Sequence, residues 1–304
     1  MDPSPAAGRI HAFMVTYRRV ESTVAAVAAL LAQSRPPDTI IVVNNGDEAD
    51  GAAITAAHPS ARVRVVNAGD NIGPAGGWEL GVRTVLADAN DGDWLLMADD
   101  EAPPPDHATI ERLLEFAQGQ VAIDPTVAGV GLVGGRFDRR TGTTVRLSDA
   151  ELVGCVDVDT IGGGHWPLLR VAAIRSVQLP DPTLFFGFEE LEYFLKIREA
   201  GLRLIVDGAA WQGLRVRWDR VGTSNTTLRR TALSPWRAYY STRNQILIAH
   251  RFGTRTARWR AAGLGAARAG RSLIRRDIAS SNAHLRGVWD GLLERRGRTW
   301  APSA

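Results

Sequence analysis

The acidic run Asp99-Asp100-Glu101 is the part of the sequence best suited to chemistry. It directly follows a short apolar segment, Trp94 to Ala98, that is typical of a buried strand. Carboxylates two positions apart bind a divalent cation from one side, and such a cation neutralises a diphosphate group. A solvated acidic loop is the plainer interpretation of adjacent acids. Their position at the end of a strand favours a metal site with Asp99 and Glu101 as its acids.

A glycine-rich segment, residues 67–77, leads into a helical pattern. Glycine lets the backbone approach a ligand, and a helix N-terminus presents free N–H groups to phosphate or ribose. The alternative is an ordinary tight loop before a helix. The glycine spacing is not that of a dinucleotide-binding loop, and the segment follows the third expected strand rather than the first.

A third group of acids, Glu189, Glu190 and Glu192, follows a run of aromatic residues at the start of a helical pattern. Acids in a first helical turn often serve only as partners of the helix dipole. Apolar neighbours can instead raise the pKa of a carboxyl, which suits it to act as a general base. Both interpretations stay open on the pattern alone.

The elements that must position these acids alternate through the first part of the chain. Strands are expected at 10–16, 39–43, 62–66 and 93–98, and helices at 20–33, 52–57, 76–89 and 106–118. Repeated strand–helix units of this length predict an α/β fold, a doubly wound and mostly parallel sheet. Ligands of such sheets bind at the carboxyl ends of the strands.

The pattern changes after Gly129. Short strands are expected at 129–134, 143–147 and 152–161, then a helix at 189–200, a strand at 203–206 and helices from 235 onward. We place a boundary near residue 232, which gives a ligand-binding and catalytic domain at 1–232 and a helical, Arg-rich appendage at 233–304.

Composition excludes several classes of protein. With 304 residues, 45% hydrophobic and 23% charged, the chain is globular rather than disordered. Cys155 is the single cysteine, so no disulfide framework exists and a cytoplasmic location is expected. The N-terminus lacks the features of a signal peptide, and no apolar run approaches the roughly 20 residues that cross a bilayer.

Charge is unevenly distributed. Twelve arginines stand against three acids from Arg251 to Ala304, whereas the whole chain carries only +3, so the preceding part is acidic. A basic amphipathic segment suits peripheral binding to a membrane surface. A helical cap with a solvated arginine face is the alternative, and both stay open. Binding of nucleic acid is not expected, because basic and stacking aromatic residues are not interleaved.

Taken in order, six motifs resemble those of the family 2 glycosyltransferases, with the galactofuranosyl- and rhamnosyltransferase branch as the nearest likeness. The motifs are Val15-Thr-Tyr-Arg-Arg19, Val42-Val-Asn-Asn45, Asn71-Ile-Gly-Pro-Ala-Gly-Gly77, Asp99-Asp-Glu101, Phe188-Glu-Glu-Leu-Glu-Tyr193 and Tyr239-Tyr-Ser-Thr-Arg-Asn244. The resemblance covers residues 10 to 250. It implies a GT-A fold and inverting transfer of a hexose from a UDP- or dTDP-linked donor to a glycan, glycolipid or natural product.

The resemblance also implies roles for individual residues. Nucleotide and donor contacts would come from Thr16, Tyr17, Arg18, Asn44, Asn45, Asn71, Gly76, Gly77, Asp99 and Asp100. Glu190 would be the general base. The acceptor side and its support would comprise His165, Trp166, Glu189, Arg243 and Asn244.

The chain departs from the family pattern at its metal ligands. Glu101 stands where the family usually has a third aspartate, and Gln212 where it commonly has a histidine. Gln212 is a weaker ligand for Mg²⁺ or Mn²⁺ because an amide oxygen carries no charge. His165 could substitute, or Arg215 or Arg217 could supply the positive charge.

These departures keep a second hypothesis open, a non-catalytic relative that binds a nucleotide-sugar or glycan as a partner subunit. A nucleotidyltransferase is disfavoured, because no glycine- and basic-rich loop for a triphosphate follows the first expected strand.

Overall fold

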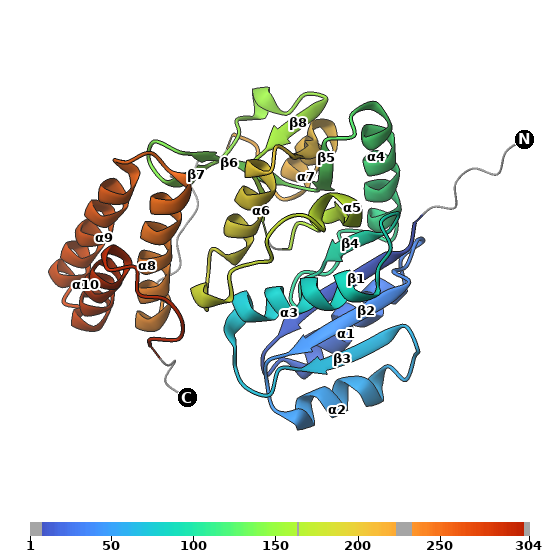
Figure 1. The fold of residues 1–304 in the computed structure, drawn as a ribbon, viewed down its shortest axis with the longest axis horizontal. Coiled ribbons are helices and arrows are strands. Elements are labelled where there is room, and N and C mark those ends of the chain that lie inside the picture. The colour runs from blue at the N-terminus through green and yellow to red at the C-terminus, as the bar shows by residue number, and fades with distance from the viewer. Residues whose placement is uncertain (1–7, 163, 223–232, 301–304) are drawn as a thin grey trace, which may run out of the picture.

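A computed structural model describes residues 8–162, 164–222 and 233–300. An eight-stranded sheet forms its centre, in the order β3-β2-β1-β4-β10-β5-β11-β8 (Figure 1). The strands are β1 (Ile10–Thr16), β2 (Thr39–Asn44), β3 (Val63–Asn67), β4 (Trp94–Met97), β5 (Val127–Gly131), β8 (Cys155–Val158), β10 (Leu168–Arg170) and β11 (Arg203–Asp207). Only β8 and β10 run antiparallel to their neighbours, so the predicted mostly parallel sheet is confirmed.

The helices of the first half join the parallel strands. They are α1 (Val20–Leu31), α2 (Glu48–Ala57), α3 (Gly73–Asp88) and α4 (Thr109–Ile123). Two buried clusters cover the two faces of the sheet. One contains Phe13, Val85 and Tyr193, and the other contains Met14, Val27 and Leu114. Alternate residues of β1 thus point to opposite faces, as expected of a central strand.

The second half is more finely divided than the sequence predicts. The expected strand at 129–134 ends as β5 at Gly131, and the chain continues as β6 (Gly134–Asp138) of a separate three-stranded sheet with β7 (Thr143–Val145) and β9 (Thr160–Ile161). The expected strand at 152–161 is likewise split into β8 and β9. The short elements η1 (Asp149–Glu151), α5 (Val171–Ile174) and η2 (Pro182–Leu184) lie between the strands.

Five longer elements complete the chain. They are α6 (Glu189–Glu199), α7 (Gly208–Arg217), α8 (Pro235–Phe252), α9 (Ala257–Ile274) and α10 (Ile278–Leu292). Figure 1 shows α8, α9 and α10 side by side at one end of the molecule. Leu247 and Phe252 of α8 share an apolar cluster with Leu191 and Leu195 of α6, so α8 packs directly on the α/β part. Across the described ranges, no helix is both long enough and apolar enough to cross a membrane.

Candidate active site

The carboxyl edge of the sheet gathers the polar ends of the first strands. β1 ends at Thr16, β2 at Asn44 and β3 at Asn67, and these three strands run parallel. The chain continues from β2 at the same edge, where the Asn45 N–H donates to the Thr16 carbonyl over 2.9 Å. Residues predicted from separate motifs are therefore neighbours.

Two asparagines at the end of β2 have different surroundings. Asn44 donates to the Asn67 side chain over 2.9 Å and to the Asp47 carbonyl over 2.8 Å, so it fixes the loop after β2. Asn45 donates to the Gly73 carbonyl over 2.9 Å, while its buried Oδ1 has no hydrogen-bond partner within the described residues. Asn45 is thus the one with spare capacity to accept a hydrogen bond.

Tyr17 and Arg18 lie where β1 leaves the sheet. The guanidinium of Arg18 sits 5.3 Å from the centre of the Tyr17 ring, and the Tyr17 side chain is exposed. Arg18 has a φ of +55°, which turns the chain away from the strand direction. The guanidinium lies over one face of this exposed ring, and both groups are planar, which suits them to stacking on a flat ligand group.

The glycine-rich loop closes on the start of α3. The Asn71 Oδ1 accepts from the Gly73 N–H over 3.0 Å. A Cβ at Gly77 would lie 2.4 Å from Val15, so glycine there lets α3 pack tightly against β1. A Cβ at Gly76 would lie 2.9 Å from Ile72. Both predicted donor-site glycines are buried: Gly77 places α3 on the sheet, and Gly76 leaves room for Ile72 at the start of α3.

Asp99 and Glu101 follow β4 at the same edge. The Asp99 Oδ1 accepts from the backbone N–H of Glu101 over 2.7 Å and of Ala102 over 3.1 Å. Its Oδ2 lies beside Gly164, where an added Cβ would be 3.7 Å away. Glu101 forms a 2.8 Å ion pair with Arg19, although its side chain is 60% exposed. No pattern in the sequence predicts this pairing.

Asp100 points inward between the two other acids. Its Oδ1 lies 3.4 Å from Arg19, and its buried Oδ2 has no hydrogen-bond partner within the described residues. Burial raises the pKa of the Asp100 carboxyl, an effect that nearby Thr16 and Arg19 partly offset. A buried carboxylate oxygen without a partner is suited to bind a cation or to accept a hydrogen bond from a ligand hydroxyl.

His165 and Trp166 precede β10, and β10 runs antiparallel to β4. The beginning of β10 therefore lies at the carboxyl end of β4, where the Met97 N–H donates to the Pro167 carbonyl over 2.8 Å. Burial and the charge of Arg220 lower the pKa of His165, and Asp99 opposes this. His165 thus lies close to both Arg220 and Asp99. Trp166 is fully buried in the core.

Gln212 lies on α7, a helix that the sequence analysis did not predict after the strand β11. Its side chain is exposed. On the same helix, Arg215 is buried against the Trp211 ring and ion-paired with Asp149, so its charge already serves to hold η1. Arg217 lies 3.9 Å from Asp106. The arginine beside the predicted acids is instead Arg19, and Arg220 lies near His165; neither was singled out from the sequence.

Glu189 and Glu190 begin α6. This helix leads through Gly201, at φ +79°, into β11, so its N-terminus faces the carboxyl edge of the parallel strands. Burial raises the pKa of Glu189 to about 7, partly offset by backbone N–H groups. Glu190 is half-buried beside it. Burial of Glu189 therefore favours the interpretation that apolar neighbours raise the pKa of a carboxyl in this helix.

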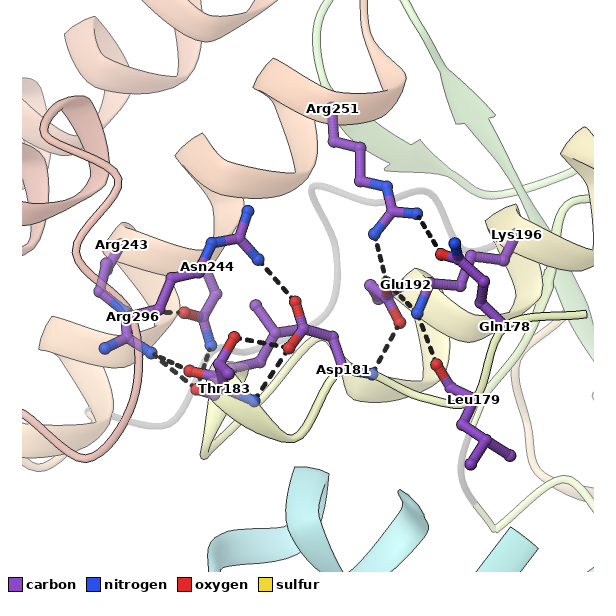
Figure 2. Close-up of polar contacts among 11 residues, drawn as sticks. Gln178, Leu179, Asp181, Thr183, Glu192, Lys196, Arg243, Asn244, Arg251 and Arg296 are labelled. Atoms are coloured by element: carbon purple, nitrogen blue, oxygen red, sulfur yellow. Dashed lines mark hydrogen bonds and ion pairs between the residues drawn. The ribbon is translucent and has the colours of Figure 1, made fainter. Parts of the chain in front are cut away.

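The loop before α6 is held by α8 (Figure 2). Arg243 donates to the carbonyls of Leu184, over 2.7 Å, and Gly297, over 2.7 Å. The Asn244 Nδ2 donates to the carbonyls of Leu184, Phe186 and Gly187 over 2.9–3.0 Å. Both side chains are completely buried. The pair thus supports the start of α6 without facing a ligand.

A second buried cluster joins the other end of α8 to α6. Glu192 forms ion pairs with Lys196, over 2.7 Å, and with Arg251, over 3.0 Å, as Figure 2 shows. It also accepts from the Asp181 N–H over 3.1 Å. Glu192 is committed to these structural contacts, which leaves Glu189 and Glu190 as the acids of the first turn suited to chemistry.

Two contacts join the glycine-rich loop at the start of α3 to the loop before α6. The Ala75 N–H donates to the Phe185 carbonyl over 3.2 Å. A Cβ at Gly73 would lie 2.1 Å from the same oxygen, at a φ of +72°. The start of α3 therefore touches the loop before α6. The glycine-rich loop, which also contacts Asn45, thus connects the strand ends with the acids of α6.

Glu189→Gln is expected to change how stability depends on pH. Because the pKa of Glu189 is about 7 in the folded protein and 4.5 ordinarily, the wild type loses stability as pH rises from about 4.5 to 7. The variant lacks this titration, so its free energy of unfolding should gain about 1–3 kcal/mol relative to wild type between pH 5 and pH 8. Urea unfolding at several pH values measures this. Glu115→Gln, at an exposed position, is the control. If the difference in unfolding free energy between Glu189→Gln and wild type were as independent of pH as that of the control, the prediction would be contradicted.

The sequence is similar to that of known proteins. Residues 12–172 match the model of Glycosyl transferase family 2. An alignment of 205 positions covers 63% of this chain and shows 27% identity to the galactofuranosyltransferase GlfT1 of Mycolicibacterium smegmatis. An alignment of 202 positions covers 64% of this chain and shows 28% identity to GlfT1 of Mycobacterium tuberculosis. Each match spans 66% of the relative, a little under two thirds of its length.

The crystal structure of GalNAc-T7 with UDP, GalNAc and Mn²⁺ superposes with a TM-score of 0.57 at 12% identity, covering 96% of this chain and 57% of that one. The likeness supports the predicted GT-A fold. Since the family model covers more than half of the sequence, the chain belongs to glycosyl transferase family 2.

Proposed function

We propose that the protein transfers a hexose from a nucleotide-diphosphate donor to an acceptor hydroxyl with inversion at the anomeric carbon. One observation supports this most: acids after β4 and at the start of α6 lie at the same edge of the sheet. Galactofuranose from a UDP-linked donor is the first candidate because of the similarity to GlfT1. Rhamnose from a dTDP-linked donor and related hexoses follow.

The nucleotide would lie over the ends of β1 and β2. The exposed ring of Tyr17 and the guanidinium of Arg18 offer stacking surfaces for the base. The unpartnered Oδ1 of Asn45 offers an acceptor for its N–H groups. Thr16, whose carbonyl accepts from the Asn45 N–H, and Asn44, which fixes the loop after β2, would position this part of the site.

The diphosphate would lie over Asp99, Asp100 and Glu101. Mg²⁺ commonly binds to one or two carboxylates together with substrate phosphates, so these acids fit a Mg²⁺ or Mn²⁺ ion, and the unpartnered Asp100 Oδ2 supports that fit. When bound, the metal ion would supply positive charge that stabilises the leaving diphosphate. Gln212 remains the proposed third ligand, and Arg19 and Arg220 bring additional positive charge to the same region.

The acceptor hydroxyl would be activated from α6. Glu190 takes the hydroxyl proton as the oxygen attacks the anomeric carbon and the bond to the diphosphate oxygen breaks on the opposite face. Glu189, whose pKa is raised to about 7, lies next to it and would hold a proton near the reacting hydroxyl. His165 and Trp166 would support the acceptor side.

Asp99→Ala combined with Glu101→Ala should weaken donor binding. Loss of the two carboxylates that would hold the cation beside the diphosphate corresponds to a Kd increase of about 10- to 100-fold in the presence of Mn²⁺. Isothermal titration with UDP and dTDP, with and without Mn²⁺, measures this affinity. Any increase in affinity that Mn²⁺ gives the wild type should be lost in the variant. Asp88→Ala with Glu115→Ala is the control, as both acids are exposed elsewhere. Equal affinities in both double variants would exclude the proposed role.

The function is tested by offering the protein a set of UDP- and dTDP-linked hexoses with soluble acceptor glycosides. We expect consumption of one donor, release of its nucleotide and a product of inverted anomeric configuration. A product of retained configuration would contradict the inverting mechanism. No consumption of any donor by a folded, nucleotide-binding protein would contradict the activity and favour a binding role.

A glycan or glycolipid acceptor would place the protein in the cytoplasm, peripherally at a membrane surface. The excess of arginine in the C-terminal helices supports this location.

A further inference from the structure

The α9–α10 hairpin carries an unusual share of exposed apolar side chains. Among the described residues, fifteen large apolar side chains are exposed, and eight of them lie between residues 257 and 293: Trp259, Leu264, Leu273, Ile274, Ile278, Leu285, Trp289 and Leu293. A soluble domain leaves such side chains scattered singly. Their concentration on one hairpin indicates a surface that contacts a partner.

The end of the hairpin, residues 271–278, combines apolar and basic side chains; we refer to it as the hairpin tip. Leu273, Ile274 and Ile278 are 59%, 85% and 62% exposed. Arg271 and Arg275 are exposed, and no ion pair or side-chain hydrogen bond joins them to any residue of the described chain. Arg276 is likewise exposed, without an ion pair or side-chain hydrogen bond to the described residues. Asp277 is the one acid of the tip, and its carboxylate caps α10 by accepting from the Ser280 N–H.

Packing fixes which way the tip points. Ala283 lies in one cluster with Ala238 and Tyr239, and Gly291 further along α10 lies against Ile246 of α8. α8 and α10 therefore run in the same direction, and the tip lies at the end where α8 begins. At that end Trp236 meets Phe186 edge-to-face, with ring centroids 4.6 Å apart. Phe186 belongs to the loop that leads into Glu189 and Glu190, so the tip and this loop lie at the same end of α8.

We propose that the hairpin tip docks on a lipid bilayer that contains anionic headgroups. Exposed aliphatic side chains at the tip would enter the headgroup boundary, and the unpaired arginines around them would meet the negative lipid charge. A second copy of the chain fits the tip less well, because symmetric contact would bring six unpaired arginines together. Nucleic acid also fits less well, because the tip offers aliphatic rather than aromatic groups to the bases.

The purpose of this docking rests on the proposed function. A bilayer held at the end of α8 next to Phe186 would bring a lipid-linked acceptor hydroxyl toward the start of α6. The docking itself depends only on the surface residues, and it is therefore measured without donor or acceptor.

Co-sedimentation with vesicles tests the proposal, using phosphatidylcholine alone and phosphatidylcholine mixed with phosphatidylglycerol. The full chain should bind the anionic vesicles and bind phosphatidylcholine at least about tenfold more weakly. Ile274→Ser with Ile278→Ser should weaken binding at least about tenfold, because burial of two isoleucines is lost. Arg271→Ala with Arg275→Ala should weaken it by about fivefold for each arginine.

Two matched controls separate the tip from general surface effects. Ile123→Ser removes an isoleucine that is 78% exposed at the end of α4, and Arg62→Ala removes an exposed arginine before β3. Both should bind as the wild type does, and all variants should keep its melting temperature. Wild-type binding by the two tip variants, or equal binding to both vesicle types, would overturn the proposal.

Two further outcomes are informative. A concentration-dependent dimer that Ile274→Ser with Ile278→Ser abolishes, without vesicle binding, would assign the tip to contact between copies and overturn lipid docking. Turnover of donor with a soluble acceptor, measured in parallel, keeps the two proposals apart. Turnover without vesicle binding refutes the docking alone, whereas vesicle binding without turnover refutes the proposed function alone.

Discussion

Glu190→Gln is expected to lower the rate constant for sugar transfer by about 10²–10⁴-fold, the range that a positioned general base contributes. The amide cannot take the acceptor proton, whereas its size matches that of the carboxylate. Donor affinity should stay within about twofold of the wild-type value, since the base acts on the acceptor. Single-turnover transfer and nucleotide titration measure the two quantities separately.

Two variants sharpen this result. Glu115→Gln makes the same chemical change at an exposed position on α4 and should transfer sugar at the wild-type rate. Glu189→Gln tests the neighbouring acid, which should change the pH profile of transfer more than its maximum. Near wild-type transfer by Glu190→Gln would show that the base lies elsewhere, and a large loss in Glu189→Gln alone would assign it to Glu189.

Arg243→Ala should destabilise the protein by about 3 kcal/mol or more, because buried carbonyls of the loop before α6 lose their donors. The guanidinium also packs against the rings of Tyr239 and Tyr240, 5.6 and 4.7 Å from their centres, so a cavity would remain. Transfer should fall as well, because Glu189 and Glu190 follow the loop that Arg243 holds. Urea unfolding and kcat at saturating donor measure both effects.

The conservative and matched variants distinguish support from direct chemistry. Arg243→Lys keeps the charge but not the planar fork, and should recover part of the stability and activity. Arg255→Ala, exposed after α8, should leave both unchanged. If Arg243→Ala kept full stability while losing transfer, Arg243 would act on the substrate, and its supporting role would be wrong.

Sequence periodicity was sufficient for the first half of the fold. The strands β1 to β4 and the helices between them consist of long, regular patterns, and the parallel sheet follows from their order. The position of Asp99 and Glu101 at a strand end, and of Glu189 at a helix start, follows from the same patterns. These were predictable because each depends on local sequence.

What the sequence could not give depends on contacts between distant residues. β10 is three residues long, and its place between β4 and β5 is decided only by pairing in the sheet. Arg19 meets Glu101 across 82 positions of sequence, which no local pattern marks. The pKa of Glu189 is raised by burial, a property of the assembled fold. α7 could have been suspected from Asp207, whose carboxylate caps it, but the glycines around Gln212 obscure the helical pattern.

The proposed transfer requires that acids after β4 and acids of α6 act on a single activated sugar. A double-mutant cycle on donor cleavage with Asp99→Ala and Glu190→Gln tests it directly, measured in single turnovers with the preferred nucleotide-sugar and a soluble acceptor. We expect each variant to be impaired and the double variant to be less impaired than the product of the two effects, because both residues serve one transition state. Full activity in either single variant would contradict the claim.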